Sequence, residues 1–552
     1  MGGATNSPAE AKGPRWAAGD FPMREGCQVE PLIDGRAAMF AMCLAFLTAR
    51  RHILLAAWDV RADLPMVRGG DARVGADGSP EQEAFLATLR EEGLDEDAIV
   101  LWRSEQLRVV DVLGYAARRG VRVGVLLWDA YHGMSHLTNS PEAERGALVA
   151  AGVDCLLDDS SRQITHIAQS LHQKCAVVDG RVAFLGGIDL TVQASGDYDR
   201  WDTHHHPCAS TERSTKRSAS AHPWHDLHAR VQGPAVADVL ENIVQRWTDV
   251  AARHNASAWP ASLVEAPPAP IVGCPPAQIV RTIPPNTYRF APSGIATIKD
   301  MYLGTFAAAQ TFVYLENQYL WPEIFVGLDT LRWGERSPDM MELLESMAAA
   351  LRRGVRIALT LPDHPNCGRR FTDAGVEWLR EQAEQAGTRA GFQVFTLGSS
   401  PEDETIPGGI FYRPVYTHAK VAIVDDAWWT VGSANLNSRG IHSDAEINVA
   451  VLDPERARDL RLRLWVEHAR YEGAQQHALH DPLSGLDALA ALVAANREHV
   501  ARRAPLEGHL LPYLTEADGR RLGLAVHQEH GWLDNLAGGV GALPEAHAQR
   551  YI

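Results

Sequence analysis

The sequence is short of lysine, of paired cysteines and of positive charge, and each shortage bears on the kind of protein it encodes. A formal net charge of −17 over 552 residues argues against a surface built to wrap nucleic acid, because phosphate binding needs clustered lysine or arginine. The seven cysteines are scattered and lack any Cys-x-x-Cys spacing. They therefore indicate neither a disulfide framework nor a zinc ribbon.

Long apolar stretches are also lacking. We find no run of about 18 apolar residues, and the N-terminal segment lacks the apolar core of a signal peptide. We therefore expect a cytoplasmic protein without a transmembrane segment, which would meet a membrane only peripherally. We also expect a monomer that has no nucleic acid partner.

The composition that remains is typical of a globular protein, with 46% apolar and 22% charged residues. Its main feature is an internal duplication. An apolar strand, a helix that ends in RRGVR and continues as a strand, and a pair of adjacent strands each occur twice in the same order. The paired segments are 53–60 with 312–320, 115–129 with 348–363, and 171–190 with 417–436.

This alternation of helices and strands predicts an α/β fold made of two related halves. A Pro- and Ala-rich stretch between them reads as a linker. Residues 208–220 and 364–413 read as surface loops. The predicted units are an N-terminal half at 1–252, the linker at 253–282, a C-terminal half at 283–470 and a helical extension at 471–552.

The third repeated segment contains the pattern H-x-K-x-x-x-x-D in both copies. On a strand, residues two apart face the same side, so each histidine should project together with its lysine, while the aspartate should position the turn. The chain has only five lysines against 47 arginines, and two of the five lie in this pattern. A compact ammonium beside an imidazole suits a phosphate that is bound and attacked. The candidate catalytic residues are His172, Lys174, Asp179, His418, Lys420 and Asp425.

Further polar residues surround the two patterns. Small residues at Gly186–Gly187 and Gly432–Ser433 would let an anion approach the backbone closely. Asp202 and Glu446 follow the histidine of their own copy at similar distances, so each could accept a hydrogen bond from that imidazole, although a surface carboxylate is the alternative. The amide of Gln318 could face the site or satisfy buried backbone. The candidate phosphate-binding or orienting residues are Asp202, Ser433, Asn435, Glu446 and Gln318.

Two residue types have competing interpretations. The histidines at 204–206, with His222, His225 and His228 nearby, match no standard zinc spacing, so we expect no metal. Some tryptophans could form a wall for a quaternary ammonium headgroup, but most tryptophans are core residues. Those considered are Trp58, Trp128, Trp201, Trp321 and Trp429.

The paired motifs, the small-residue turns and the segment YLENQY with Glu316, Asn317 and Gln318 resemble the phospholipase D superfamily. The segments RWDTHHHP at 200–207 and PWHDLHARVQGPAV at 223–236 are similar to signatures of its lipases rather than to those of bacterial cardiolipin synthases. The resemblance covers most of the chain from about residue 50 to 470.

The resemblance implies two α/β/α sandwich halves related by a pseudo-twofold axis. It also implies a phosphohistidine intermediate, no cofactor or catalytic metal, and transfer to water or to a primary alcohol. By the same resemblance His172 is the nucleophile and His418 the acid and base. The expected substrate is a glycerophospholipid such as phosphatidylcholine, cleaved to phosphatidate. Cardiolipin-type synthesis, nuclease action and noncatalytic headgroup binding are the alternatives, and the acidic charge weighs against DNA.

Overall fold

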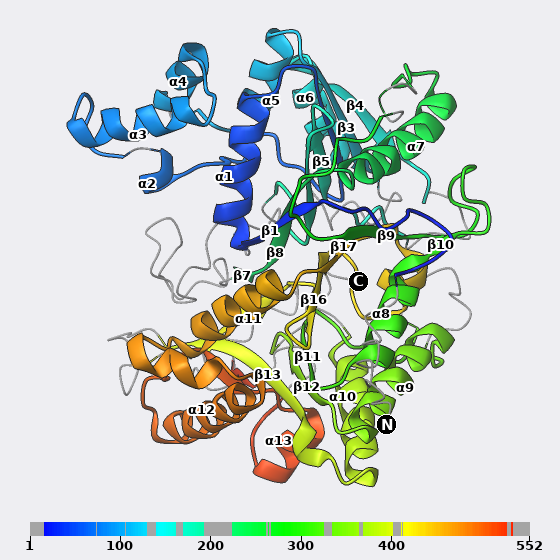
Figure 1. The fold of residues 1–552 in the computed structure, drawn as a ribbon, viewed down its shortest axis with the longest axis vertical. Coiled ribbons are helices and arrows are strands. Elements are labelled where there is room, and N and C mark those ends of the chain that lie inside the picture. Colours follow the sequence, from blue (N-terminus) through cyan, green and yellow to red (C-terminus); the bar gives the residue numbers. More distant parts are fainter. Residues whose placement is uncertain are drawn as a thin grey trace, which may run out of the picture.

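The protein is described here by a computed structural model, and the residues placed in it form two sheets flanked by helices (Figure 1). The described residues are 16–72, 74–104, 106–129, 140–161, 169–191, 224–260, 263, 266–324, 334–363, 368–400, 410, 412–526 and 532–533.

The first half is built on a seven-stranded sheet with the order β1-β8-β6-β5-β2-β3-β4. Side chains of the central strand β2 alternate between two cores, because successive residues of a strand face opposite sides. Ile53 and Leu55 pack in the core beneath α1 and α5, whereas Leu54 and Ala56 pack in the core beneath α7. The strands are β1 (Gln28–Ile33), β2 (His52–Ala57), β3 (Arg122–Trp128), β4 (Asp154–Asp158), β5 (Cys175–Val178), β6 (Val182–Gly186) and β8 (Leu227–Gln232). The helices are α1 (Asp34–Leu47), α2 (Gly69–Ala72), α3 (Pro80–Glu91), α4 (Glu96–Arg103), α5 (Val109–Arg118), α6 (Pro141–Ala150) and α7 (Val236–His254).

The second half is built on an eleven-stranded sheet with the main path β10-β9-β17-β16-β15-β11-β12-β13-β14-β7, and β18 pairs with β13. Its central strand β11 also divides its side chains, with Val313 and Leu315 facing the core beneath α8 to α10 and Phe312 and Tyr314 facing α11. The strands are β7 (Trp224–His225), β9 (Ala277–Ile283), β10 (Ile295–Ala296), β11 (Phe312–Glu316), β12 (Arg356–Thr360), β13 (Phe392–Ser399), β14 (Arg413–Thr417), β15 (Val421–Val424), β16 (Trp428–Gly432), β17 (Glu446–Leu452) and β18 (Leu510–Pro512). The helices are α8 (Thr297–Ala308), α9 (Pro338–Arg352), α10 (Arg369–Gln385), α11 (Pro454–Ala469), α12 (Pro482–Arg502) and α13 (Glu516–Leu522), with short helical turns at η4 (Arg389–Gly391), η5 (Arg439–Ser443) and η6 (Gly473–Leu479).

The two halves repeat one topology, which confirms the predicted α/β fold. In each, the motif strand lies antiparallel to the first strand of the repeat, with Ile53 opposite Val178 and Val313 opposite Val424. Helix α5 ends at Arg118 and helix α9 at Arg352, and two residues later each is followed by a glycine with positive φ. The angle is +85° at Gly120 and +88° at Gly354, a conformation that glycine adopts without strain.

The predicted linker and extension both contribute strands to the second sheet. The last residues of the linker form β9, which pairs with β17, and the extension supplies β18. One prediction is wrong: residues 364–413 include α10 and β13 rather than only a surface loop. The missed signal is the helical spacing of Val376, Leu379 and Ala383 on the buried face of α10, which many polar neighbours conceal.

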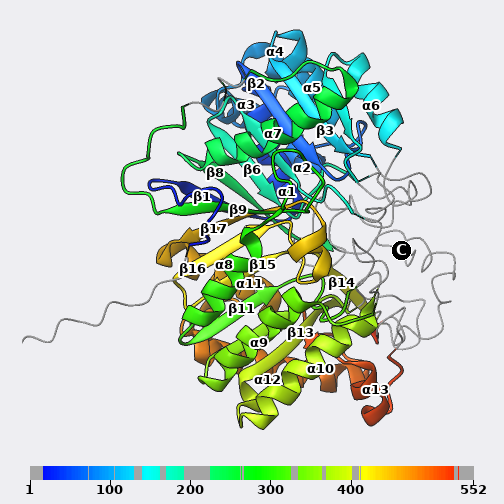
Figure 2. The same cartoon turned by 90° about the vertical axis from the view of Figure 1, so that its right-hand side faces the viewer.

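The halves meet through β6 and β8 on one side and β16 and β17 on the other, as Figure 2 shows at the middle of the molecule. Residues from both halves share one hydrophobic core there, including Leu185, Ala229, Val431 and Ile447. None of the described helices has the length and apolarity needed to cross a bilayer.

Candidate active site

Both motif histidines lie just before a strand rather than on it. His172 and Lys174 precede β5, and His418 and Lys420 lie between β14 and β15. Each segment is hydrogen-bonded to the opposite half, since the His172 amide donates to the Ala445 carbonyl at 3.0 Å and the His418 amide donates to the His225 carbonyl at 2.7 Å. The two motifs are therefore held where the halves meet.

Each imidazole is paired with a carboxylate from the other half. Nδ1 of His172 lies 2.8 Å from Oε1 of Glu446, and Nδ1 of His418 lies 2.7 Å from Oδ2 of Asp226. We predicted that Glu446 would serve the histidine of its own copy, and this partner is wrong. The other predicted acceptor, Asp202, lies outside the described residues.

Asp226 is a functional candidate that the sequence reasoning missed. It directly precedes β8, as Glu446 begins β17, and both strands pair with the strand that ends in the small-residue turn. Gly186 faces His228 in one half and Gly432 faces Asn448 in the other, so Asp226 and Glu446 occupy equivalent positions. The signal in the sequence is the segment PWHDLHARVQGPAV at 223–236, which contains Asp226 just before an apolar strand.

The small-residue turns make room for these carboxylates. A Cβ at Gly187 would lie 2.0 Å from Oδ1 of Asp226, so any larger residue would displace the carboxylate. In the second copy, the hydroxyl of Ser433 donates to Oε2 of Glu446. Ser433, predicted to bind phosphate, thus orients the partner of His172.

The electrostatic surroundings favour a neutral His172. Burial, followed by the positive charges of Lys174 and Lys420 and by His418, holds the pKa of the His172 imidazole well below its usual value. These contributions come from both motifs, which places both in one electrostatic environment. Burial, and next the charge of Asp444, raises the pKa of the Glu446 carboxyl. With Nδ1 donating to Glu446, the lone pair of the neutral ring is on Nε2.

The two motif lysines have different partners. Lys174 Nζ lies 3.3 Å from Oδ2 of Asp189, and both side chains are buried. In the second copy Asn435 replaces that aspartate, and the oxygen of Gln318 accepts from Lys420 at 3.3 Å and from Asn435 at 3.2 Å. Both predicted amides therefore lie beside the second lysine.

The motif aspartates are structural in their contacts. Asp179 accepts from the backbone amides of residues 50–52, and Asp425 accepts from those of residues 310–312, at distances between 2.7 and 3.0 Å. Both adopt positive φ, +55° and +56° respectively. They tie the turn after the motif strand to the start of β2 or β11, and their carboxylates are engaged there.

Aromatic rings lie against both imidazoles. Trp58 meets His172 edge-on with ring centres 6.1 Å apart and stacks on Trp128, while Trp224 lies 4.7 Å from His418. Trp321 and Trp429 are buried core residues, and Trp201 lies outside the described residues. Of the four of these tryptophans that the structure describes, Trp58 is the one whose ring meets a motif residue, and Trp128 lies behind it in the stack.

The histidine run has a mixed outcome. His204–His206 and His222 lie outside the described residues, whereas His225 is buried with Glu316 and His468 in a set of donors that could hold a metal ion. A second such set comprises Asp34, His225 and Glu467. His228 is buried on β8, and burial lowers its pKa to about 3.

Family models match segments of both halves of the chain. A family model described as "Phospholipase D" matches residues 96–266, and one described as "Cardiolipin synthase, PLD-like domain" matches residues 333–465. Phospholipase D alpha 3 of Arabidopsis thaliana is 24% identical, over 84% of this chain and 67% of its own length. Phospholipase D alpha 1 of Oryza sativa subsp. japonica is also 24% identical, over 81% of this chain and 68% of its own length.

Among solved structures, a phosphatidylserine synthase of Haemophilus influenzae Rd KW20 aligns with 87% of this chain and 96% of its own, with a TM-score of 0.47 and 11% identity. Each of the two matched ranges of this chain contains one H-x-K-x-x-x-x-D motif. Together with the plant relatives, the two family models show that this chain belongs to the phospholipase D superfamily and is an enzyme of the phospholipase D type.

Proposed function

We propose that the protein cleaves glycerophospholipids such as phosphatidylcholine to phosphatidate, and that it also transfers the phosphatidyl group to primary alcohols. The supporting observation is the crossed pair of His-carboxylate contacts, each beside a lysine, at the junction of the halves. Two oriented imidazoles can divide one difficult displacement into two easier steps.

In the first step, Nε2 of His172 attacks phosphorus and the P–O bond to the headgroup breaks. His418 gives its proton to the leaving oxygen, so the headgroup leaves with a hydroxyl group in place of an alkoxide, and His172 carries the phosphatidyl group. In the second step, His418 takes a proton from water or an alcohol, whose oxygen then displaces His172. The side chain of His172 is 15% exposed and that of His418 is 6% exposed, which gives the nucleophile the readier access to substrate.

The carboxylates support these roles by holding the rings. A carboxylate on Nδ1 fixes the tautomer and stabilises the cation that forms when Nε2 takes a proton or a phosphoryl group. Lys174, Lys420 and Asn435 are the groups that we assign to the nonbridging oxygens. Asp189 offsets the charge of Lys174, so the second copy is the more cationic cradle.

The test is to incubate purified protein with phosphatidylcholine, phosphatidylethanolamine, phosphatidylglycerol and a DNA diester, with and without 1-butanol. We expect free headgroup, phosphatidate and, with butanol, phosphatidylbutanol. His172→Ala and His418→Ala should each lose all three products, whereas Lys299→Gln, a surface change, should retain them. Full activity in either histidine variant would contradict the scheme.

A cardiolipin-type transfer is the second candidate, because the model matching residues 333–465 carries that description. It predicts that phosphatidylglycerol serves as both donor and acceptor in the same assay. Cardiolipin as the main product, with little phosphatidate from phosphatidylcholine, would favour that function.

A further inference from the structure

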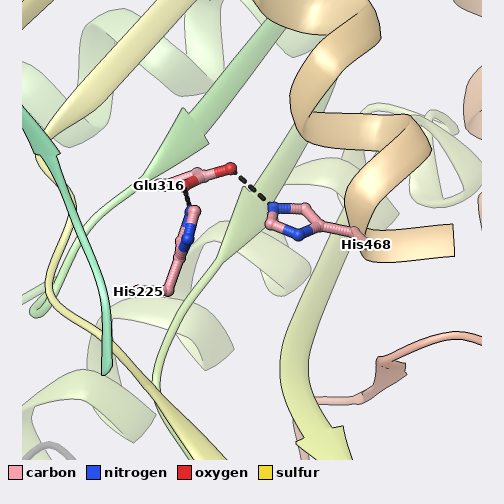
Figure 3. Close-up of side chains that lie close together, drawn as sticks. All are labelled: His225, Glu316 and His468. Atoms are coloured by element: carbon pink, nitrogen blue, oxygen red, sulfur yellow. Dashed lines mark hydrogen bonds and ion pairs between the residues drawn. The ribbon is translucent and has the colours of Figure 1, made fainter. Parts of the chain in front are cut away.

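A buried cluster of ionisable side chains lies directly behind His418. His225, Glu316 and His468 have no solvent-exposed surface in their side chains, and both rings point at the one carboxylate (Figure 3). Nε2 of His225 lies 2.8 Å from Oε2 of Glu316, and Nε2 of His468 lies 2.9 Å from Oε1. The hydroxyl of Tyr314 donates to Oε1 at 2.6 Å.

The His225 ring, on a strand of the second sheet, also reaches the start of α1 beside the first sheet. Its Nδ1 lies 3.2 Å from Oδ1 of Asp34, and the same oxygen accepts from the Asp226 amide at 3.1 Å. Burial opposes a charge on the ring, but Glu316 and Asp34 outweigh it and raise the pKa of His225 well above its usual value. The ring is therefore held between two carboxylates, Asp34 of α1 and Glu316 of β11.

This ring is joined to the site through two consecutive residues. The carbonyl of His225 accepts from the His418 amide at 2.7 Å, and the next residue, Asp226, binds Nδ1 of the His418 ring at 2.7 Å. The dipeptide thus fixes both the backbone and the ring of His418. Any shift of the His225 side chain would move both contacts.

The equivalent position beside His172 carries no such group. Ala445 there accepts from the His172 amide, and the next residue, Glu446, binds the His172 ring. Within the part of the chain that the structure describes, a histidine held between two carboxylates is consequently a feature of the His418 side. In the proposed reaction that side must hold one ring in place for two successive proton transfers.

We propose that His225 is a positioning residue for proton transfer by His418, acting by clamping the His225–Asp226 dipeptide between Asp34 and Glu316. The kinetic test of this inference rests on the proposed function, because it measures phospholipid cleavage. A metal ion is the competing occupant, since two imidazoles and a carboxylate can bind zinc. However, the two rings address different oxygens at hydrogen-bond distances, and the Tyr314 hydroxyl completes the set of donors to Glu316.

The kinetic test uses two leaving groups. His225→Gln and the matched control His52→Gln, a buried histidine of β2 whose ring lies against Trp259, are assayed with phosphatidylcholine and with phosphatidyl-p-nitrophenol. Departure of p-nitrophenolate needs no proton, so kcat/KM for that substrate should be insensitive to His418. We expect His225→Gln to lower kcat/KM for phosphatidylcholine by about 10- to 100-fold and for the activated ester by less than about 3-fold.

The control should leave the ratio of the two kcat/KM values at its wild-type value. Equal losses of His225→Gln on both substrates would overturn the positioning role. A wild-type protein that cleaves neither substrate would instead reject the proposed function. Should His225→Gln fail to fold, Tyr314→Phe removes one donor to Glu316, and it should show the same leaving-group dependence at a smaller size.

Two measurements do not depend on activity. The downfield proton resonance of His418 Nδ1–H, identified by its loss in His418→Ala, should shift in His225→Gln and not in His52→Gln, and an unchanged resonance would overturn the clamp. Elemental analysis of the purified protein should find no stoichiometric metal. One equivalent of zinc that disappears in His225→Gln would replace the clamp with a metal site.

Discussion

The two histidines rest on networks of different chemistry. Behind His172, the amide of Gln173 donates to the Glu446 carbonyl at 3.0 Å, and its oxygen accepts from Asn242 and from Arg246 at 2.7 and 2.6 Å. Arg246 in turn binds Asp158 at 3.1 Å. Behind His418, the supporting groups are instead histidines and carboxylates.

This difference separates a support made mainly of amides and an arginine from one made mainly of histidines and carboxyl groups. Amides do not titrate and an arginine stays protonated at any ordinary pH, so Gln173, Asn242 and Arg246 keep their charge states. Glu446, which contacts the His172 ring itself, is the group on this side whose pKa is raised. The network behind His418 depends on the protonation of His225, Glu316 and His468. This difference fits the proposed roles of the two histidines. His172, the proposed nucleophile, must stay neutral, whereas His418, the proposed acid and base, must exchange protons.

The largest expected effect comes from breaking the crossed carboxylates. Glu446→Gln and Asp226→Asn should each lower kcat by about 10³- to 10⁴-fold, because an amide permits the wrong tautomer. With phosphatidyl-p-nitrophenol, Asp226→Asn should accumulate the adduct on His172, visible by mass spectrometry after an alkaline quench. Glu446→Gln should not accumulate it. The reverse pattern would exchange the assigned roles of the histidines.

The next effect concerns stability. Arg246 is fully buried with Asp158. Arg246→Met removes the nearer guanidinium partner of that carboxylate and leaves Arg253 at 3.7 Å, so it should cost about 3 kcal/mol, the lower end of the range for a broken buried pair. Denaturant unfolding followed by tryptophan fluorescence measures it. Arg90→Met, at an exposed pair with Glu96, should leave the midpoint unchanged. A loss no larger than that of the control would show that the first network is not held by its ion pair.

A smaller effect is expected at the motif lysine. Lys174 is the largest charge contribution that lowers the pKa of His172, so Lys174→Gln should raise that pKa. The acid limb of the kcat/KM profile should then move to higher pH, and the rate should fall by about 100-fold. Lys299→Gln serves as the surface control. An acid limb that stays in place or moves to lower pH would show that the charge of Lys174 does not lower the pKa of His172.

The smallest effect tests the titratable network through Glu467. Burial, with the charge of Asp34, raises the pKa of this carboxyl to about 8. A raised folded-state pKa gives stability that is present below the unfolded value and lost as pH rises through about 8. Glu467→Gln should therefore melt about 2 °C higher than wild type at pH 9, with a smaller gain at pH 5. A gain that does not grow with pH would contradict the raised pKa.

Local patterns were sufficient to predict the α/β class and the repeat. The turns at Gly120 and Gly354 and the strands around the motifs depend on neighbours in sequence, and these are placed as expected. The helix α10 was missed because its buried residues are diluted by charged ones. The partners of the imidazoles could not be found by counting along one copy, since Glu446 and Asp226 cross between copies. Pairing by strand register, in addition to spacing from the histidine, identifies Asp226 as the counterpart of Glu446.

The crossed pairing also bears on how the repeat can change over time. A substitution in either copy alters its own histidine and, through Glu446 or Asp226, the histidine of the other copy. Neither half can therefore diverge toward a separate function while the other half alone maintains the reaction. The two halves must therefore evolve together. Either half expressed alone would contain a motif histidine without its carboxylate partner.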